Sequence, residues 1–221
     1  IGQMQPSDAP EKTDPIWEKI PNSFFGDTKE TTTPPTTTEP QPTEPFITAT
    51  ASVGVTGDIM GHMPVINAGK TADGYDYAEV FQYIKPYYES YDVMVANLEV
   101  NLGGPEAGPY QGYPTFNSPD GMAQSLKDAG VDMVLTANNH SYDTSSVGMH
   151  RTIEIIRDRG LDHIGFVDKD EEKRYLVKEI NGINIGMICY TYETDNRADT
   201  VALNGLPVKA DDKNIAYSFV R

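Results

Sequence analysis

Three polar clusters interrupt the apolar stretches in the middle of this 221-residue chain. They are GDIMGH at 57–62, NLE at 97–99 and NNH at 138–140. Each follows a short apolar, β-prone run, which is typical of a strand that gives way to a loop. Ligand sites of open α/β sheets form beyond the carboxyl ends of the strands. We therefore expect the three clusters to belong to one site.

The alternation of strand-like and helix-like segments predicts an α/β protein with a parallel or mixed sheet. Ser118 is expected to cap a helix that has Pro119 at its first position, and Pro86 to end or kink an earlier one. Asn181-Gly182 predicts a hairpin. The expected strands are 47–56, 93–96, 131–136, 164–166, 175–180 and 183–191, and the expected helices are 77–88, 118–129 and 145–159.

The composition of the first 45 residues is not that of a folded domain. Residues 31–45 contain seven threonines and five prolines. Proline removes backbone donors and favours extended conformations, and so few apolar groups cannot offset the ordering entropy. We expect a disordered Thr/Pro-rich spacer over 1–45 and a domain over 46–221. Such spacers commonly hold a domain away from a wall or membrane, which predicts an extracellular protein at the cell surface.

Composition excludes several classes of protein. Lys and Arg number 17 against 33 Asp and Glu, and the net charge of −16 disfavours nucleic-acid partners. Cys189 is the single cysteine, so one chain forms neither a disulfide nor a cysteine-based zinc site. No apolar run reaches the roughly 18–20 residues of a membrane span. Because the chain begins at Ile1, we expect an export signal or membrane anchor upstream.

The first two clusters offer donors to a cation. Asp58 lies in a Gly-Asp turn that projects a carboxylate over a strand end; the alternative is an ordinary turn aspartate. His62 could supply nitrogen to the same ion or be a plain loop histidine. Asn97 and Glu99 are two residues apart, so an extended backbone points both to one side. Two oxygen donors on one side, after a hydrophobic strand, require water, hydrogen-bond partners or a cation. The alternative is that Asn97 and Glu99 cap neighbouring backbone groups at the strand end.

The third cluster is the most specific. The amide oxygen of Asn139 is a neutral ligand for a divalent cation, and His140 is a candidate ligand or general acid. Asp143 lies three residues later, where it can orient the imidazole by accepting from its other nitrogen. The alternative is an Asn-rich turn before a helix. His150 and His163 are assigned to structural roles.

Residues 101–117 form a loop rich in Gly, Pro and Tyr, long enough to suggest a function. Tyr110 and Tyr113 are candidates to line a substrate groove, although tyrosine is also common in extracellular loops.

Together the motifs GDIMGH, VMVANLEV, VLTANNHSYD and GINIGMICYT resemble the CapA/PgsA family over residues 49–191. These are bacterial capsule (poly-γ-glutamate) synthesis proteins, related to the calcineurin-like metallophosphoesterases. The resemblance implies a metallophosphoesterase-like αββα sandwich of two mixed sheets. It also implies a divalent metal ion (Mn, Fe, Zn or Mg) and a histidine, His140, that polarises or protonates a leaving group. The implied metal ligands are Asp58, His62, Asn97, Glu99 and Asn139.

The implied function is synthesis, export or anchoring of poly-γ-glutamate or a related anionic polymer, with a membrane-bound synthesis complex as partner. The alternatives are a non-catalytic polymer-binding scaffold of the cell envelope and a metal-dependent phosphoesterase. Metallophosphoesterase-like sites draw further histidine ligands from the second half of the domain, whereas this chain has no histidine after His163. We therefore expect an N-terminal portion of a longer protein, inactive without a C-terminal segment that completes the site.

Overall fold

The structure is a computed structural model that describes residues 48–167, 173–192, 202–208 and 219–220. The chain divides into two units, 1–46 and 47–221, and all described residues belong to the second. The predicted spacer over 1–45 lies outside the described residues. Among the helices that are described, none has the length and apolar character to cross a bilayer.

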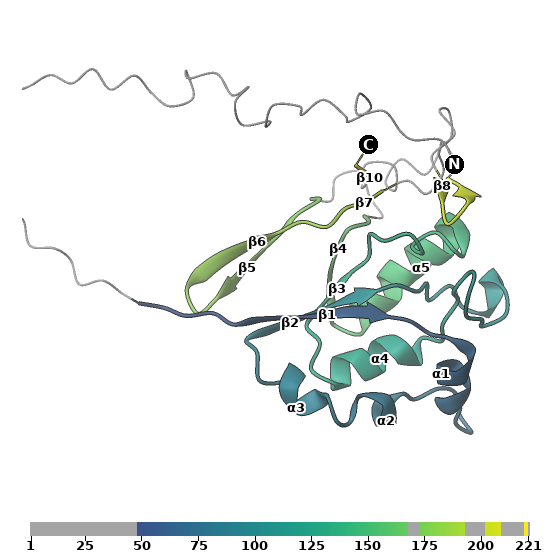
Figure 1. Ribbon diagram of the computed structural model, residues 1–221, viewed down its shortest axis with the longest axis horizontal. Helices are drawn as coiled ribbons and strands as arrows, with labels where there is room; N and C mark the ends of the chain where they lie inside the picture. Colours follow the sequence, from purple (N-terminus) through teal and green to yellow (C-terminus); the bar gives the residue numbers. More distant parts are fainter. Residues whose placement is uncertain (1–47, 168–172, 193–201, 209–218, 221) are drawn as a thin grey trace, which may run out of the picture. The chain divides into compact units, whose positions relative to one another are not determined.

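Four parallel strands form the main sheet in the order β1-β2-β3-β4 (Figure 1). A right-handed crossover between neighbouring parallel strands, repeated in one direction, places the connecting helices on one face. The strands are β1 (Val53–Ile59), β2 (Val93–Leu98), β3 (Met133–Leu135) and β4 (Asp162–Ile164). The connections hold α1 (Met63–Ala68), α2 (Ala78–Phe81), α3 (Lys85–Tyr88), the 3-10 turn η3 (Pro105–Ala107), α4 (Gly121–Asp128) and α5 (Ser145–Asp158).

The two faces of this sheet bury different partners. Ala96 and Val134 face the helices and pack in one cluster with Leu126 of α4 and Ile156 of α5. On the opposite face a hairpin of β5 (Leu176–Ile180) and β6 (Ile183–Met187) packs over the side chains of β2, β3 and β4. Full burial of each large apolar side chain contributes about 1.5–3 kcal/mol. The domain is therefore layered as helices, parallel sheet and antiparallel hairpin.

Four short strands complete the described elements. β7 (Thr191–Tyr192) pairs with β10 (Phe219–Val220), and β8 (Ala202–Leu203) pairs with β9 (Leu206–Pro207). Leu203 is completely buried and anchors the β8–β9 hairpin against Met149 and Ile153 of α5.

The predicted α/β class with a parallel sheet is confirmed. The hairpin at Asn181-Gly182 is also confirmed, because both residues have positive φ (52° and 81°) at the turn between β5 and β6. The hairpin's outward-facing Val177 and the nearby Ile188 are exposed within the described part of the domain. The helices, the parallel sheet and the β5–β6 hairpin correspond to one helix layer and two sheet layers of the expected αββα sandwich.

Two local predictions need correction. The helix expected over 77–88 is divided into α2 and α3, with Pro86 in the first turn of α3. Ser118 is not the helix cap, because α4 starts at Gly121 after Asp120. The backbone nitrogen of Ser118 donates to the carbonyl of Asn101, next to the bridge between Asn101 and Asn117, which keeps Ser118 outside the helix.

Candidate functional site

A β-bulge in β1 brings the first two polar clusters together. Val55 pairs with Val95, but Asp58 pairs with Asn97, so β1 holds one residue more than β2 over this stretch. Side chains alternate between the faces of a strand, and an extra residue reverses the alternation beyond it. The bulge therefore turns Asp58 to the same side of the sheet as Asn97.

Asp58 and Glu99 share a single hydrogen-bond donor. The side-chain nitrogen Nδ2 of Asn97 donates to Oδ1 of Asp58 at 2.7 Å and to Oε2 of Glu99 at 3.0 Å. The predicted convergence of these three residues is thus present in the structure, although they come from two strands. The amide group lies between two carboxylates, where a positive charge would be stabilised.

Asn138 fixes the orientation of this amide. Its Nδ2 donates to Oδ1 of Asn97 at 3.1 Å and to the carbonyl of Leu98 at 3.0 Å. The oxygen of Asn97 is consequently used by Asn138, and its nitrogen faces the carboxylates. For Asn97 to coordinate a cation through oxygen, the amide must turn over, so its role as a ligand stays a prediction.

The carboxyl of Glu99 has a raised pKa. Burial is the main cause, followed by its hydrogen bond with Asp58 and the negative charge of that residue. The charge of Asp143 also raises the pKa of Glu99, whereas that of His140 opposes the shift. The site therefore has a shortage of positive charge when both carboxylates are ionised.

His140 and Asp143 form a buried pair. Nδ1 of His140 lies 2.8 Å from Oδ2 of Asp143, and the Asp143 side chain is 0% exposed. The backbone nitrogen of Phe116 donates to the same oxygen at 2.6 Å. A carboxylate accepts the Nδ1 proton, which leaves Nε2 of a neutral imidazole as the basic nitrogen. The predicted contact is present, and the catalytic role of the pair stays a prediction.

Phe116 separates the two histidines of the site. Its ring makes edge contacts with His62 at a centroid distance of 5.0 Å and with His140 at 4.8 Å. His62 is exposed and directly precedes α1. Among the described residues its ring contacts that of Phe116, on which His140 also packs, and it makes no hydrogen bond to Asp58 or Glu99.

Asn139 is half-buried and its side chain makes no hydrogen bond to another described residue. Its neighbour Asn138 is the residue that binds Asn97 directly. The structure therefore assigns different tasks to the two asparagines of the third cluster, and Asn139 retains a free amide oxygen.

The two carboxylates that lie together, Asp58 and Glu99, offer oxygen ligands of the kind that Mg²⁺, Mn²⁺ and Ca²⁺ accept. Asn139 has an amide oxygen of the same class, but no contact joins it to these carboxylates among the described residues. Over the ranges that the structure covers, no three His, Cys, Asp or Glu side chains form a metal-binding group. A tight site would therefore need donors beyond these.

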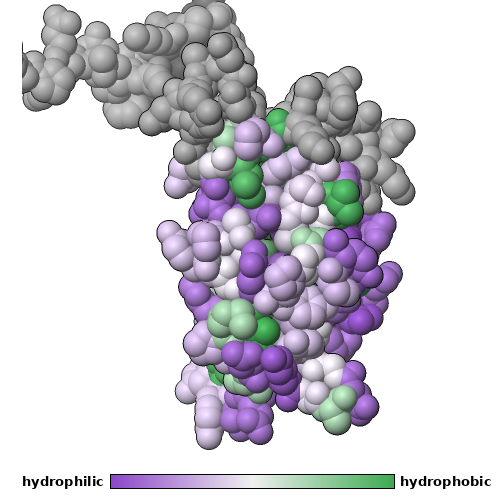
Figure 2. Space-filling model, turned by 90° about the vertical axis from the view of Figure 1, so that its right-hand side faces the viewer, coloured by the Kyte–Doolittle hydropathy of each residue, from purple (hydrophilic) through white to green (hydrophobic). Residues whose placement is uncertain are grey.

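The side of the domain toward which the parallel strands run is mainly hydrophilic. Figure 2 shows this side, where hydrophobic colour appears only in small, scattered patches among the residues that are not grey. Such a surface fits a polar or charged substrate better than an apolar one.

One asparagine closes the loop at 101–117 on itself, and another ties the loop to the segment that follows the third cluster. Nδ2 of Asn117 donates to the carbonyl of Gly104 at 3.0 Å, and Nδ2 of Asn101 donates to the carbonyl of Ser141 at 2.9 Å. Tyr113 is 75% exposed, whereas Tyr110 packs edge-on against Tyr75. Of the two predicted groove tyrosines, Tyr113 is thus the more exposed, and Tyr110 is half-buried.

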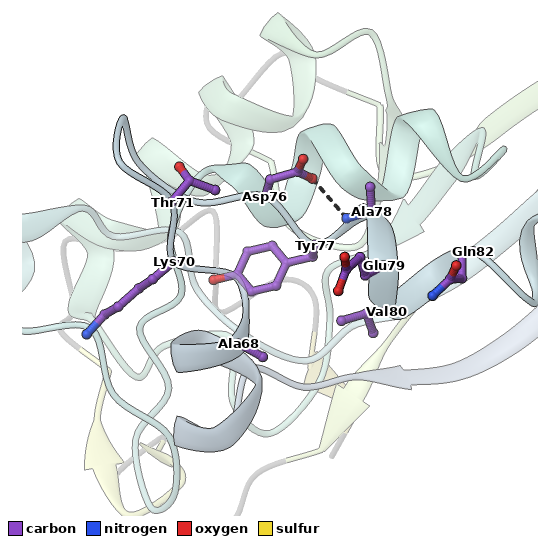
Figure 3. A pocket seen from close by; sticks show the side chains of 9 residues that line it. All are labelled: Ala68, Lys70, Thr71, Asp76, Tyr77, Ala78, Glu79, Val80 and Gln82. Atoms are coloured by element: carbon purple, nitrogen blue, oxygen red, sulfur yellow. Dashed lines mark hydrogen bonds between the residues drawn. The ribbon is translucent and has the colours of Figure 1, made fainter.

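A cavity of about 460 Å³ lies away from these residues, at the connection between α1 and α2. Figure 3 shows the Tyr77 ring among its lining residues, with Asp76 accepting from the backbone nitrogen of Ala78. The Tyr77 hydroxyl is buried without a hydrogen-bond partner among the described residues, and burial raises its pKa. None of the predicted site residues lines this cavity.

Replacement of Glu99 by glutamine is expected to stabilise the metal-free domain at pH 7. A raised carboxyl pKa means that folding favours the protonated form, so its ionisation destabilises the fold as pH rises. The gain should be on the order of 1 kcal/mol or less, absent below about pH 4 and complete above the raised pKa of Glu99. Urea unfolding of both proteins between pH 4 and 8 measures it. A constant difference across this range would contradict the assignment.

Sequence reasoning missed Phe116 and Asn204. Asn204 is the first turn residue between β8 and β9, and its Nδ2 lies 2.9 Å from Oδ1 of Asp143. The Asn204-Gly205 dipeptide is a hairpin signal that marks such a turn, but nothing local in sequence points it at Asp143.

Comparison with known proteins identifies relatives. The family model described as bacterial capsule synthesis protein PGA_cap matches residues 52–217. A capsule biosynthesis protein CapA of Bacillus anthracis is 25% identical over 122 residues, which cover 53% of this chain and 29% of that protein. A PGA biosynthesis protein CapA of Bacillus subtilis (strain 168) is 24% identical over 153 residues, covering 63% and 37%. The chain thus matches about a third of the length of these relatives. The matches confirm the resemblance predicted from the motifs.

Proposed function

Because the chain belongs to the bacterial capsule synthesis protein family, we propose that it acts in synthesis, export or anchoring of poly-γ-glutamate or a related anionic polymer. The proposed place of action is the outside of the cell, close to a membrane-bound synthesis complex and anchored through a segment upstream of Ile1. The capsule names of both relatives support this assignment.

We further propose a cation-dependent hydrolytic or transfer site at the carboxyl ends of β1, β2 and β3. The observation that carries it is the shared donor of Asp58 and Glu99, two carboxylates that lie together at the expense of a raised Glu99 pKa. Asp58, Glu99 and Asn139 would hold a divalent cation. Such an ion, when bound, would activate a water nucleophile and stabilise negative charge on oxygen.

The role of His140 follows from its surroundings. Asp143 holds Nδ1, so Nε2 is the nitrogen able to give or take a proton at the leaving oxygen. The Phe116 ring restricts the rotation of the imidazole. The Asp143 partner and the packing of Phe116 support the role of His140 as a general acid or base.

A non-catalytic scaffold is the second candidate. The small number of metal-binding side chains in the described part of the chain favours it, because two carboxylates hold a cation weakly. Under this alternative the same end of the sheet binds polymer through bridging cations, which would also offset the repulsion between a polyanion and a chain of net charge −16.

Calorimetric titration with Mn²⁺ tests the proposal. We expect one saturable site in the chain, weak enough to lie in the micromolar to millimolar range. Poly-γ-glutamate hydrolysis or transfer and aryl phosphodiester cleavage are then assayed with and without Mn²⁺. Binding without any turnover supports the scaffold, and the absence of both Mn²⁺ and polymer binding would refute the cation site.

A further inference from the structure

The turn of the β8–β9 hairpin contacts the His140–Asp143 pair. Nδ2 of Asn204 lies 2.6 Å from the carbonyl oxygen of Pro114, 2.9 Å from Oδ1 of Asp143 and 3.3 Å from Nδ1 of His140. Asn204 is separated from these residues by at least sixty positions in sequence. The tertiary fold alone creates this contact.

Two features hold Asn204 in place. Asn204 and Gly205 both have positive φ (48° and 73°), the backbone of a two-residue hairpin turn for which Asn-Gly is the favoured pair. Leu203 directly before the turn is 0% exposed, and it packs against Tyr142 and Phe166. The anchored hairpin therefore presents the Asn204 amide to the site from a rigid support.

The orientation of the amide follows from its neighbours. Pro114 and Asp143 both offer oxygen acceptors, so the amide nitrogen and not the oxygen must face them. An amide nitrogen has two hydrogens, and these two acceptors use both. Nδ1 of His140 therefore receives no proton from Asn204, and it satisfies its own hydrogen bond as a donor to Asp143.

Asp143 is then completely satisfied. Oδ1 accepts from Asn204, and Oδ2 accepts from the backbone nitrogen of Phe116 and from His140. A carboxylate with donors on both oxygens has its plane fixed, whereas one held through a single oxygen can rotate. The position of Oδ2 against the imidazole thus depends on the donor at Oδ1.

We propose that Asn204 is a positioning residue, which fixes the Asp143 carboxylate and thereby keeps His140 in the tautomer with hydrogen on Nδ1 and a free Nε2. The catalytic consequence rests on the proposed function, in which Nε2 exchanges a proton with the substrate. The geometric part does not, because it concerns only side chains of this chain.

The test compares two Asn-Gly turns of the same protein. Asn204→Gly removes the amide but keeps the left-handed backbone. Asn181→Gly is the matched control, because it makes the same deletion at the β5–β6 turn, where the amide donates to the carbonyl of Thr50. The tautomers of the four histidines are read from ring ¹⁵N shifts of ¹⁵N-histidine-labelled protein at neutral pH.

We expect His140 to be in the Nδ1–H form in the wild type and in Asn181→Gly. In Asn204→Gly the ratio of the Nδ1–H to the Nε2–H form should fall about tenfold, since the loss of one hydrogen bond to a charged group is of that size. Faster amide exchange of Phe116 with an unchanged tautomer ratio would mean that Asn204 only anchors the loop, and it would overturn the proposal.

A second variant decides the question if Asn204→Gly does not fold. Aspartate also tolerates the left-handed backbone, and in its protonated form Asn204→Asp can donate to Asp143 as the amide does. At pH 7 the two carboxylates repel each other. A carboxylic acid has one hydrogen where the amide has two, so the Pro114 carbonyl loses its donor. The variant should therefore be less stable than the wild type in urea unfolding at pH 4 and lose further stability progressively toward pH 7. A difference from wild type that is independent of pH would overturn the proposal.

Failure of this proposal is distinguishable from failure of the proposed function. Tautomer ratios and unfolding curves need neither a cation nor a substrate. A chain that binds no Mn²⁺ can still show the tautomer effect, and a chain with a functional cation site can lack it.

Discussion

Glu99→Gln is expected to weaken Mn²⁺ binding by more than about 100-fold. Loss of a residue that only hydrogen-bonds to a metal ligand lowers affinity by up to about 100-fold, and loss of a ligand itself should lower it further. The substitution removes one of two carboxylates while preserving shape, and the glutamine oxygen can still accept from Asn97. Calorimetric titration of both proteins at pH 7 measures the loss. Glu79→Gln, an exposed carboxylate of α2, is the control and should bind as the wild type does.

The same substitution should have opposite effects on stability and binding. Neutralising Glu99 removes the cost of burying its charge and its repulsion with Asp58, so the metal-free domain becomes more stable while the affinity for the cation falls. A buried group that opposes folding in this way is typical of a functional site. Loss of both stability and binding would instead indicate that Glu99 serves only to hold the loop.

His140→Gln is expected to lower any cation-dependent turnover by about 10²–10⁴-fold, the usual contribution of a general acid or base. Mn²⁺ affinity should change little, because His140 contacts Asp143 and Phe116 and makes no hydrogen bond to Asp58 or Glu99. Initial rates at saturating Mn²⁺ provide the measurement. His150→Gln, in the middle of α5, is the matched control. If the two variants turn over equally, the acid–base role of His140 is refuted.

The predicted classes of element and their order could be obtained from periodicity and turn chemistry. Gly130 and Gly160 end helical stretches with positive φ, and Asn181-Gly182 forms the hairpin that its dipeptide predicts. Boundaries were less accurate. The expected strand at 47–56 begins at Val53 and runs on to Ile59, because pairing with β2 and not β-propensity decides where a strand lies.

Some contacts of the candidate site were predictable from the sequence, and others depended on packing. Asn97 and Glu99 lie two positions apart, and His140 and Asp143 three, so local geometry was enough to predict that each pair would meet. Asn138 was harder to assign, since either asparagine of the third cluster could face the site. Packing against β2 decided that Asn138 binds Asn97, while Asn139 keeps a free oxygen.

The sequence alone determined that polar donors stand at the ends of three successive strands, because alternation and strand order depend on near neighbours. Only the tertiary structure decided that Asp58 turns toward Asn97, through an extra residue in β1. It also decided that Asn204 reaches Asp143 from a hairpin sixty positions away. Both depend on how distant segments pair and pack, and a residue's neighbours in sequence carry no record of these contacts.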